Sequence, residues 1–177
     1  KSNFFHTTAY KGQVADISLY RIRYCSDVTI CSAPLRSYYL LYLPITGRIR
    51  VESDGQKTDV LPGEIIVVNP FNSYTLHKMD DSVQLTLKFD RTKLEIYLNA
   101  LFGHSPMGPI SFESDQALKY RNCENLIRII SLVEADLFAG SGMYNDEVSG
   151  SIAEKLLLDM LLRQVPNNYS KNLFTNQ

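Results

Sequence analysis

Between residues 47 and 69 the chain alternates short apolar runs with turn residues. In the first run, Ile49 and Val51 alternate with charged residues, which is the period-two pattern of a strand with one buried face. The pair Asp54-Gly55 follows and predicts a hairpin turn, because both residues tolerate a positive φ. A Leu-Pro-Gly-Glu sequence then predicts a second reversal before four apolar residues of strand length, which indicate burial on both faces. The stretch therefore predicts three short strands joined by tight turns.

Comparable patterns lie on both sides of that stretch. The further strand candidates are the ranges 17–24, 28–33, 37–46, 74–79 and 83–89. A turn at Asp80-Asp81 is expected to separate the last two. In 37–46 both faces are apolar, which predicts a strand covered by a barrel interior on one side and by helices on the other. Pro44 should mark an edge or a bulge, since it cannot donate to the ladder. About eight short strands at this spacing predict a β-sandwich or β-barrel.

From Asp90 onward the apolar positions change to helical spacing. Helices are predicted over the ranges 90–103, 114–140 and 145–165, with Asp90 and Ser114 as N-caps and with glycines ending the first two. A loop containing Pro106 is expected between the first and the second.

The last helix carries more apolar surface than a single contact requires. Its sequences Leu156-Leu157-Leu158 and Met160-Leu161-Leu162 are apolar nearly all round. A homodimer interface built from this helix is the economical explanation, and a fully buried core helix in a monomer is the alternative. The candidate dimerisation residues are Ile152, Leu156, Leu157, Met160 and Leu161.

The order of these elements resembles a known family along nearly the whole chain. The reversal Leu61-Pro62-Gly63-Glu64, four apolar residues and Asn69-Pro70 are similar to the centre of a cupin-type β-barrel. More closely, the chain resembles the effector-binding domain of AraC/XylS-type transcriptional regulators. The expected fold class is mainly β with α, a cupin-like β-barrel of about eight strands followed by a C-terminal helical dimerisation segment.

This resemblance implies a division of the chain into four parts. They are an N-terminal arm (1–16), the barrel (17–89), the helical segment (90–166) and a polar linker (167–177) toward a DNA-binding domain that the chain does not contain. In the resembled family such an arm can fold over the effector pocket, and the alternative is an arm that packs on the barrel as an ordinary edge. The start at Lys1 rather than Met predicts a piece trimmed from a longer protein.

The composition of the chain argues against nucleic acid and membranes as partners. The chain has 177 residues, 45% hydrophobic and 21% charged, with a net charge of −1. This balance is typical of a globular domain and lacks the basic excess of a nucleic-acid-binding surface. No apolar stretch approaches the length of a membrane span, so a cytoplasmic protein is expected. The three cysteines lack metal-like spacing and are expected to be buried free thiols.

Catalytic and metal-binding patterns are missing. The only histidines are His6, His77 and His104, without the closely spaced pair with which cupins hold a metal ion. Phosphate-binding glycine loops, nucleophile elbows and zinc-protease motifs do not occur either. We therefore expect no metal, no cofactor and no catalytic residues. A metal-free cupin isomerase or lyase remains a rival, and Asp59, Glu64 and His77 are its only nearby acid/base candidates.

The remaining candidate for a functional site is a small-molecule pocket in the barrel. An inward arginine can hold a carboxylate through a bidentate fork, and tyrosine faces can stack on a ring. The alternative is that arginines alternating with apolar residues lie on the wet face and that His77 is exposed. The candidate effector-binding residues are Tyr20, Arg21, Arg23, Arg36, Tyr38, Tyr42, Tyr74 and His77.

The sequence thus predicts the sensing and dimerisation domain of an AraC/XylS-like regulator. Its expected partners are a small-molecule effector and a second copy of the chain, with DNA bound only through the absent C-terminal domain. A dimerisation module that binds no ligand is the second alternative. In it, the barrel would be closed and filled by side chains.

Overall fold

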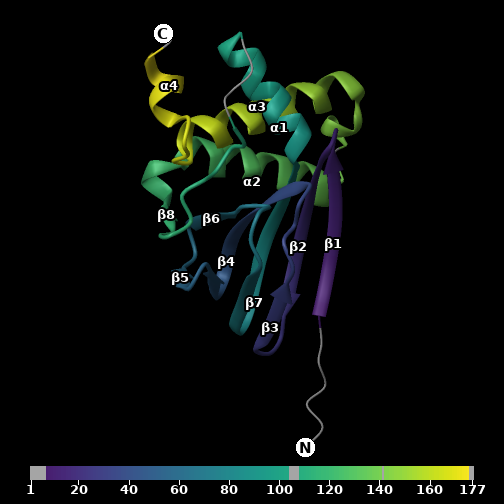
Figure 1. The fold of residues 1–177 in the computed structure, drawn as a ribbon. Helices are drawn as coiled ribbons and strands as arrows, with labels where there is room; N and C mark the ends of the chain where they lie inside the picture. Colours follow the sequence, from purple (N-terminus) through teal and green to yellow (C-terminus); the bar gives the residue numbers. More distant parts are fainter. Residues whose placement is uncertain (1–6, 104–107, 141, 176–177) are drawn as a thin grey trace, which may run out of the picture.

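The structure is a computed structural model that describes residues 7–103, 108–140 and 142–175, without the side chains of residues 80, 174 and 175. Residues 1–6, Pro106 and His104 therefore lie outside the described part of the chain. Figure 1 shows a strongly bent sheet with helices gathered on one side of it. The strands are β1 (Thr7–Val14), β2 (Ile17–Tyr24), β3 (Val28–Ser32), β4 (Tyr38–Ser53), β5 (Gln56–Val60), β6 (Glu64–Val68), β7 (Tyr74–Asp90) and β8 (Leu118–Lys119). The helices are α1 (Arg91–Phe102), α2 (Glu124–Ala139), α3 (Glu147–Gln164) and α4 (Ser170–Thr175).

All strand pairs in the described part of the chain are antiparallel and form one eight-stranded sheet. Its order is β1-β2-β7-β4-β6-β8, with β3 paired to β7 and β5 paired to β4. The long strands β4 and β7 therefore belong to both halves of the fold. The cupin-like class is confirmed, with the correction that the sheet is not closed into a complete barrel.

The strand β4 bends at its middle. Its register with β7 shifts between Pro44 and Thr46 and again between Thr46 and Arg48, which confirms the bulge predicted at Pro44. Gly47 lies in this bend with φ +70°, a conformation that side chains rarely adopt. The predicted break between separate strands at residues 46 and 47 is therefore wrong, because the chain bends there without leaving the ladder.

The turn predicted at Asp80-Asp81 is also wrong. Strand β7 runs without interruption from Tyr74 to Asp90, and its two halves pair with β3 and β2 respectively. The exposed Asp81 carboxylate accepts two hydrogen bonds from Arg23 on β2. An acidic pair that looks like a turn in the sequence thus lies on a bent strand, where a cross-strand arginine neutralises one of its charges.

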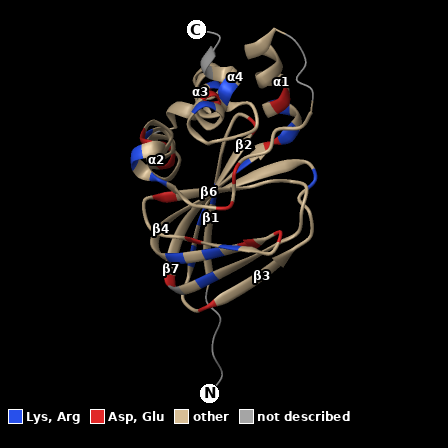
Figure 2. Ribbon diagram, turned by 60° about the vertical axis from the view of Figure 1, so that its left-hand side comes forward, with Lys and Arg blue, Asp and Glu red and all other residues tan. Residues whose placement is uncertain are grey.

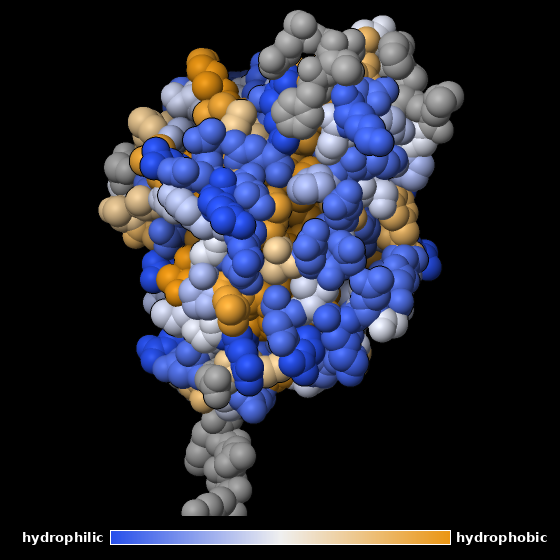
Figure 3. All heavy atoms as spheres, turned by 90° about the vertical axis from the view of Figure 1, so that its left-hand side faces the viewer, coloured by the Kyte–Doolittle hydropathy of each residue, from blue (hydrophilic) through white to orange (hydrophobic). Residues whose placement is uncertain are grey.

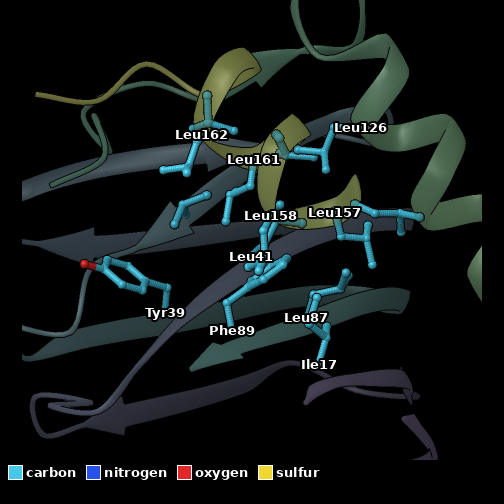
Figure 4. Packing of buried hydrophobic residues seen from close by; sticks show 14 of the residues in the cluster. Ile17, Tyr39, Leu41, Leu87, Phe89, Leu126, Leu157, Leu158, Leu161 and Leu162 are labelled. Carbon is cyan, nitrogen blue, oxygen red and sulfur yellow. The ribbon is translucent and has the colours of Figure 1, made fainter. Parts of the chain in front are cut away.

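Two hydrophobic clusters cover the two faces of the sheet. The larger cluster joins β2, β4, β6 and β7 to the helices. Figure 4 shows Leu157, Leu158, Leu161 and Leu162 of α3 above Leu41, Leu87 and Phe89 of the sheet. The smaller cluster lies on the opposite face and includes Tyr42, Ile49, Ile66, Tyr74 and Leu76. The prediction that residues 37–46 are covered on both faces is confirmed for residues 39 and 41–44, whereas residues 38 and 40 are partly exposed and residues 45 and 46 are exposed.

The helix signals were accurate at five of the six predicted boundaries, and α3 (Glu147–Gln164) lies within the predicted range 145–165. Asp90 caps α1 by accepting from the Lys93 N–H at 2.9 Å, and Gly103 ends it in the left-handed conformation. Gly140 ends α2 in the same way. Ser114, however, does not begin a helix, since α2 starts at Glu124. Leu118 and Lys119 pair with β6 instead, so sheet pairing replaces the predicted first turns.

The two ends of the chain are more structured than the sequence suggested. Residues 7–14 of the expected arm form β1, an edge strand in continuous register with β2. This agrees with the ordinary-edge alternative. At the other end, Asn167 and Leu173 are buried and residues 170–175 are helical. The linker interpretation is therefore wrong for residues 167–175.

The cysteine prediction is corrected in part. All three thiols are free, but only Cys123 is buried, whereas Cys25 and Cys31 are exposed. Cys31 lies on the wet face of β3, opposite Thr75. No helix within the described ranges is long and apolar enough to cross a membrane.

Candidate functional site

The candidate site lies on the inner face of the sheet, which we define as the face that carries Tyr24, Tyr42, Tyr74 and Lys78. Alternation along β7 places Ser82, Gln84 and Thr86 on this face too, while Leu85, Leu87 and Phe89 point to the helices. The inner face of β7 is therefore polar where it pairs with β2 and apolar near Leu76. All these polar side chains are buried.

Lys78 is the unusual residue of this face. It is 1% exposed, and its Nζ lies 3.6 Å from the centroid of the Tyr24 ring. Among the described residues, no hydrogen bond or ion pair is recorded for its ammonium group. Because burial disfavours the charged form, the pKa of Lys78 falls to about 7. A buried lysine without an anion is costly, and such groups often mark functional sites.

Ser82 and Gln84 have unmet hydrogen-bonding capacity beside it. Ser82 Oγ and Gln84 Oε1 are buried without a hydrogen-bond partner among the described residues. The Gln84 amide nitrogen donates to Thr86 Oγ1 at 2.9 Å, so only its oxygen is left over. Buried polar atoms are rarely unpartnered in native proteins, and each of them calls for an explanation such as a bound molecule.

Tyrosines form the next part of the inner face. The hydroxyl groups of Tyr42 and Tyr74 lie 2.8 Å apart, and both residues are buried. Burial raises the pKa of each phenol, so both remain neutral donors and acceptors at pH 7. Tyr38 lies under the ammonium of Lys88, with Nζ 4.3 Å from the ring centroid.

Several inner-face side chains keep some contact with solvent. Ile30, Tyr38 and Leu40 pack against the smaller cluster but are only partly buried. These three side chains therefore form a partly exposed margin of the inner face. Figure 3, which faces the β5 and β6 side, shows apolar atoms at depth between polar rims.

The structure brings four of the eight predicted effector-binding residues to the inner face. These are Tyr20, Tyr38, Tyr42 and Tyr74, which belong to β2, β4 and β7. Tyr20 shares its face with Tyr24 by alternation along β2. The aromatic part of the sequence prediction is therefore gathered in one place.

The predicted arginines do not share this place. Arg21 and Arg23 lie on the opposite face of β2, the face of Ile17 and Leu19. Arg21 Nη1 bonds Glu134 of α2 at 2.7 Å. Arg36 is exposed in the connection before β4, with φ +63°. The expectation of an inward arginine on β2 is therefore wrong, because strand alternation places Arg21 and Arg23 on the helix-covered face and not on the inner face.

His77 also lies on the face of the sheet opposite the inner face. Its Nε2 lies 3.2 Å from Glu52 Oε1, and its Nδ1 lies 3.0 Å from Thr29 Oγ1. Lys78, the next residue, occupies the inner face in its place. The sequence interpretation missed Lys78, Ser82 and Gln84, although the alternation Tyr74-Leu76-Lys78 marks one face and was a usable signal.

A hollow lies on the opposite face of the sheet, near the end of α2. It measures about 580 Å³ and is lined by Thr8, Tyr10, Arg21, Arg23, Val83 and Phe138. Its two guanidinium groups are already paired, with Glu134 and Asp81. The hollow is therefore close to charge-neutral and offers no free cation. Within the described ranges, no group of three or more His, Cys, Asp or Glu side chains is placed to hold a metal ion.

The predicted dimerisation residues divide between two faces of α3. Leu157 and Leu161 are 0% exposed and lie in the core between helix and sheet (Figure 4). They cannot line an interface, so this part of the prediction is wrong. Met160 is partly buried and packs against the same core. Ile152 and Leu156 are exposed, and Val148 continues their line one turn earlier.

Comparisons with known proteins agree with this fold. Over residues 2–162 the chain matches the family described as AraC-binding-like domain. It is similar to XylDLEGF operon transcriptional activator 1 of Pseudomonas putida, with 25% identity over 161 residues that cover 90% of this chain and 48% of that protein. XylDLEGF operon transcriptional activator 3 of the same organism is 24% identical over 161 residues, which cover 90% of this chain and 46% of that protein.

Among solved structures, the chain is similar to the AraC-like transcriptional activator CuxR, with a TM-score of 0.71 and 14% identity. The likeness covers 90% of this chain and 55% of that one, and it shows the shared fold. The chain spans about half the length of the curated relatives it matches. Since the family match extends over nearly all of the described sheet and helices, the chain belongs to the family of AraC-binding-like domains.

Proposed function

We propose that this chain is the effector-sensing and dimerisation domain of an AraC/XylS-type transcription regulator in the cytoplasm. Family membership and the transcriptional activators among its relatives support the regulatory role. The observation that carries the sensing role is the inner face, where Lys78 is buried on the same strand as Ser82 Oγ and Gln84 Oε1, two buried atoms without a hydrogen-bond partner among the described residues. A small molecule bound there would satisfy these groups. Its different affinity for two arrangements of the domain would then shift the regulator between states.

DNA binding belongs to another part of the proposed regulator. The relatives are about twice as long as the aligned segment, and we propose that a helix-turn-helix domain C-terminal to this chain contacts the promoter. The net charge of −1 supports this division. Figure 2 shows acidic and basic residues interspersed over helices and strands, without the one-sided basic surface that nucleic acid favours.

The dimerisation role rests on the exposed stripe of α3, which we define as Val148, Ile152 and Leu156. These residues are spaced by four and lie on one side of the helix. The opposite side of α3 is already filled by core contacts. An apolar line on a helix next to solvent favours burial against a partner, and a second copy of this chain supplies a matching stripe.

We favour a non-enzymatic role. The acid/base candidates Asp59, Glu64 and His77 each have a separate partner. The Arg50 guanidinium binds Asp59 at 2.6 Å, the Leu61 N–H donates to Glu64 at 3.1 Å, and His77 contacts Glu52. None of them shares a common reacting position on the inner face.

Thermal unfolding with a panel of small aromatic acids, sugars and fatty acids tests the sensing role, with mass measured in parallel by light scattering. A ligand at about 100 times its dissociation constant adds roughly 2.7 kcal/mol to the folded state. A shift together with a dimeric mass is the expected result. A dimer that no compound stabilises would instead indicate a dimerisation module, and a monomer would contradict the α3 interface.

A further inference from the structure

The turn between β1 and β2 lies directly against α3, the helix of the proposed dimer. It consists of Ala15 and Asp16, since Val14 and Ile17 close the hairpin as register partners. Ala15 has φ +47°, although it is not a glycine. A side chain in this left-handed region is strained and persists only where the surroundings hold it in place. The surroundings that hold this turn come from two helices.

Side chains of α3 and α1 bind Asp16. Its backbone N–H donates to Glu154 Oε1 of α3 at 3.1 Å, and its carboxylate lies 2.7 Å from Lys93 Nζ of α1. Both partners of the ion pair are about half exposed, so water screens it and it contributes little. A backbone N–H that donates to a carboxylate forms a stronger bond than one between neutral groups. The bond to Glu154 is therefore the main polar contact between the turn and α3.

One helical turn earlier on α3, Gly150 allows the helix to approach the hairpin closely. Gly150 is buried. A Cβ atom at this position would lie 2.9 Å from the backbone oxygen of Tyr144 and 3.7 Å from the backbone nitrogen of Ala15. Because a Cβ atom does not come that close to a backbone oxygen, a larger residue would push α3 away from this corner. The hairpin and the short helical turn Met143–Asn145 thus place the start of α3.

The same part of α3 carries the exposed stripe. In the sequence, Gly150 and Glu154 alternate with the three residues of the stripe. Successive residues of an α-helix are separated by roughly 100°, so residues two apart point in nearly opposite directions. The two sets therefore lie on opposite sides of one short stretch of helix. A displacement of this stretch at the hairpin also displaces the exposed stripe, because a helix moves as a rigid element over so short a distance.

We propose that the β1–β2 turn sets the strength of the α3 dimer, by holding the exposed stripe in the orientation that fits a second copy. Glu154 and Gly150 are positioning residues, which act from the side of the helix opposite the interface. This inference rests on the proposed dimerisation function and concerns its regulation. By linkage, association of two copies must stabilise the turn by as much as the turn favours association. The sheet thereby influences the interface without contributing a side chain to it.

Hydrogen exchange of the unmodified chain tests this linkage without any substitution. The Asp16 amide should exchange at least about fivefold more slowly in the dimer than in the monomer, which is the low end of ordinary coupling between sites. Dilution of one sample supplies both states. The Glu64 amide is the control, because it bonds the Leu61 carbonyl at 3.0 Å within the connection between β5 and β6. Less protection than this at Asp16, or the same protection at Glu64, would overturn the proposal.

Substitutions on the inner side of α3 test the coupling from the other end. Glu154→Ala removes the acceptor of the Asp16 N–H and should raise the dissociation constant of the dimer at least about fivefold. Glu154→Gln keeps an acceptor oxygen and should raise it less. Glu134→Ala is the matched control, since Glu134 makes a comparable contact from α2 to Arg21 of β2 and should leave the constant unchanged. Analytical ultracentrifugation over a dilution series measures the constants. An unchanged constant for Glu154→Ala, or an equal loss in Glu134→Ala, would contradict the role of the turn.

These outcomes separate the inference from the function on which it rests. A chain that stays monomeric at every concentration would overturn both. If Ile152→Glu dissociates a dimer that Glu154→Ala does not weaken and that does not protect the Asp16 amide, the α3 interface stands and its control by the turn is overturned.

Discussion

Lys78 combines the strongest burial with the least compensated charge among the described residues of the inner face. Its ammonium has an aromatic ring on one side and aliphatic neighbours on two adjacent strands. A cation over a tyrosine face recovers only part of the hydration that it loses. The buried charge of Lys78 therefore lowers the stability of the unliganded domain. Such a loss of stability is common for residues that are kept for binding.

Replacing this charge should change how stability depends on pH. The pKa of Lys78 is lowered from 10.5 to about 7 in the folded chain, so between these values the unfolded chain binds more protons. The contribution of Lys78 to the free energy of unfolding therefore rises with pH between these two pKa values, by at most about 1.4 kcal/mol per pH unit. Lys78→Met removes the effect and should be more stable than the unmodified chain at pH 7, with a gap that narrows toward pH 9. Urea unfolding at pH 7, 8 and 9 measures the gap, and a constant difference would show that the ammonium is not destabilised by burial.

Gly47 is the second residue with a specific requirement. A Cβ atom there would lie 2.7 Å from Ser82 Cβ and 3.0 Å from Ser82 Cα, and the backbone has φ +70°. The bend of β4 thus needs the absence of a side chain both for its conformation and for its approach to β7.

Gly47→Ala should cost more than an ordinary left-handed glycine. Gly55 has φ +75° with open space around its Cβ position, so Gly55→Ala carries only the conformational cost of about 1–2 kcal/mol. We expect Gly47→Ala to lose about 2–4 kcal/mol, because the contact with Ser82 adds to that cost. Equal losses in chemical denaturation would mean that the strands move apart without penalty.

Among the elements, the segment 108–119 connects the sheet to the C-terminal residues. Asn69, just after β6, binds both backbone groups of Phe112, at 2.8 and 2.9 Å. On its other side, Glu113 N–H donates to Pro166 at 2.9 Å, and Phe112 forms a bridge with Asn167. Residues that follow α3 are thereby held to the sheet through this segment.

Asn69→Ala should loosen that connection. The substitution removes two hydrogen bonds, each worth about 0.5–1.5 kcal/mol, and leaves the Phe112 backbone groups without those partners. Hydrogen exchange of the Phe112 and Glu113 amides should accelerate. Asn72→Ala is the control, because the one side-chain hydrogen bond of Asn72 within the described residues goes to the exposed Asp54 in a turn, and its loss should change stability by less than about 0.5 kcal/mol. Unchanged exchange at Phe112 would show that Asn69 is not what holds the segment.

Helix α3 is apolar on two sides for two different reasons. Its inner side packs on the sheet, and its outer stripe of Val148, Ile152 and Leu156 faces solvent in the single chain. Only the outer stripe is available to a partner.

Ile152→Glu should dissociate the proposed dimer. Ile152 and Leu132 are both 63% exposed, so neither substitution should disturb the core, and Leu132→Glu on α2 is a matched control. A charge in the centre of an apolar interface is desolvated without a partner, which typically costs several kcal/mol. Light scattering should give a monomeric mass for Ile152→Glu and a dimeric mass for Leu132→Glu. The reverse outcome would place the interface on α2.

For the whole molecule, dimerisation couples stability to concentration. If two copies associate through α3, the midpoint of thermal unfolding should rise with protein concentration, because mass action favours the associated folded state. Scanning calorimetry over a hundredfold range of concentration measures this. Ile152→Glu should abolish the dependence, whereas a concentration-independent midpoint in the unmodified chain would indicate a monomer.

The sequence by itself determined the kinds of element and most of their limits. Local signals suffice where a residue acts on its own backbone, as Asp90 does at the start of α1 and Gly140 at the end of α2. Alternation and apolar runs likewise predicted most of β2 to β7 but neither β1 nor β8, and the order of elements matched the family that the comparisons show.

Tertiary pairing decided what local signals could not. Whether Asp80-Asp81 forms a turn depends on strands β2, β3 and β4 beside it, and whether residues after Ser114 form a helix depends on the pairing of Leu118 and Lys119 with β6. The face of each strand is also set by distant contacts. Alternation shows that Arg23 and Tyr24 point in opposite directions, but only packing of the helices on one face shows which direction is inward. The candidate site therefore moved from the arginines to Lys78, because a residue's distance from water is a property of the assembled fold.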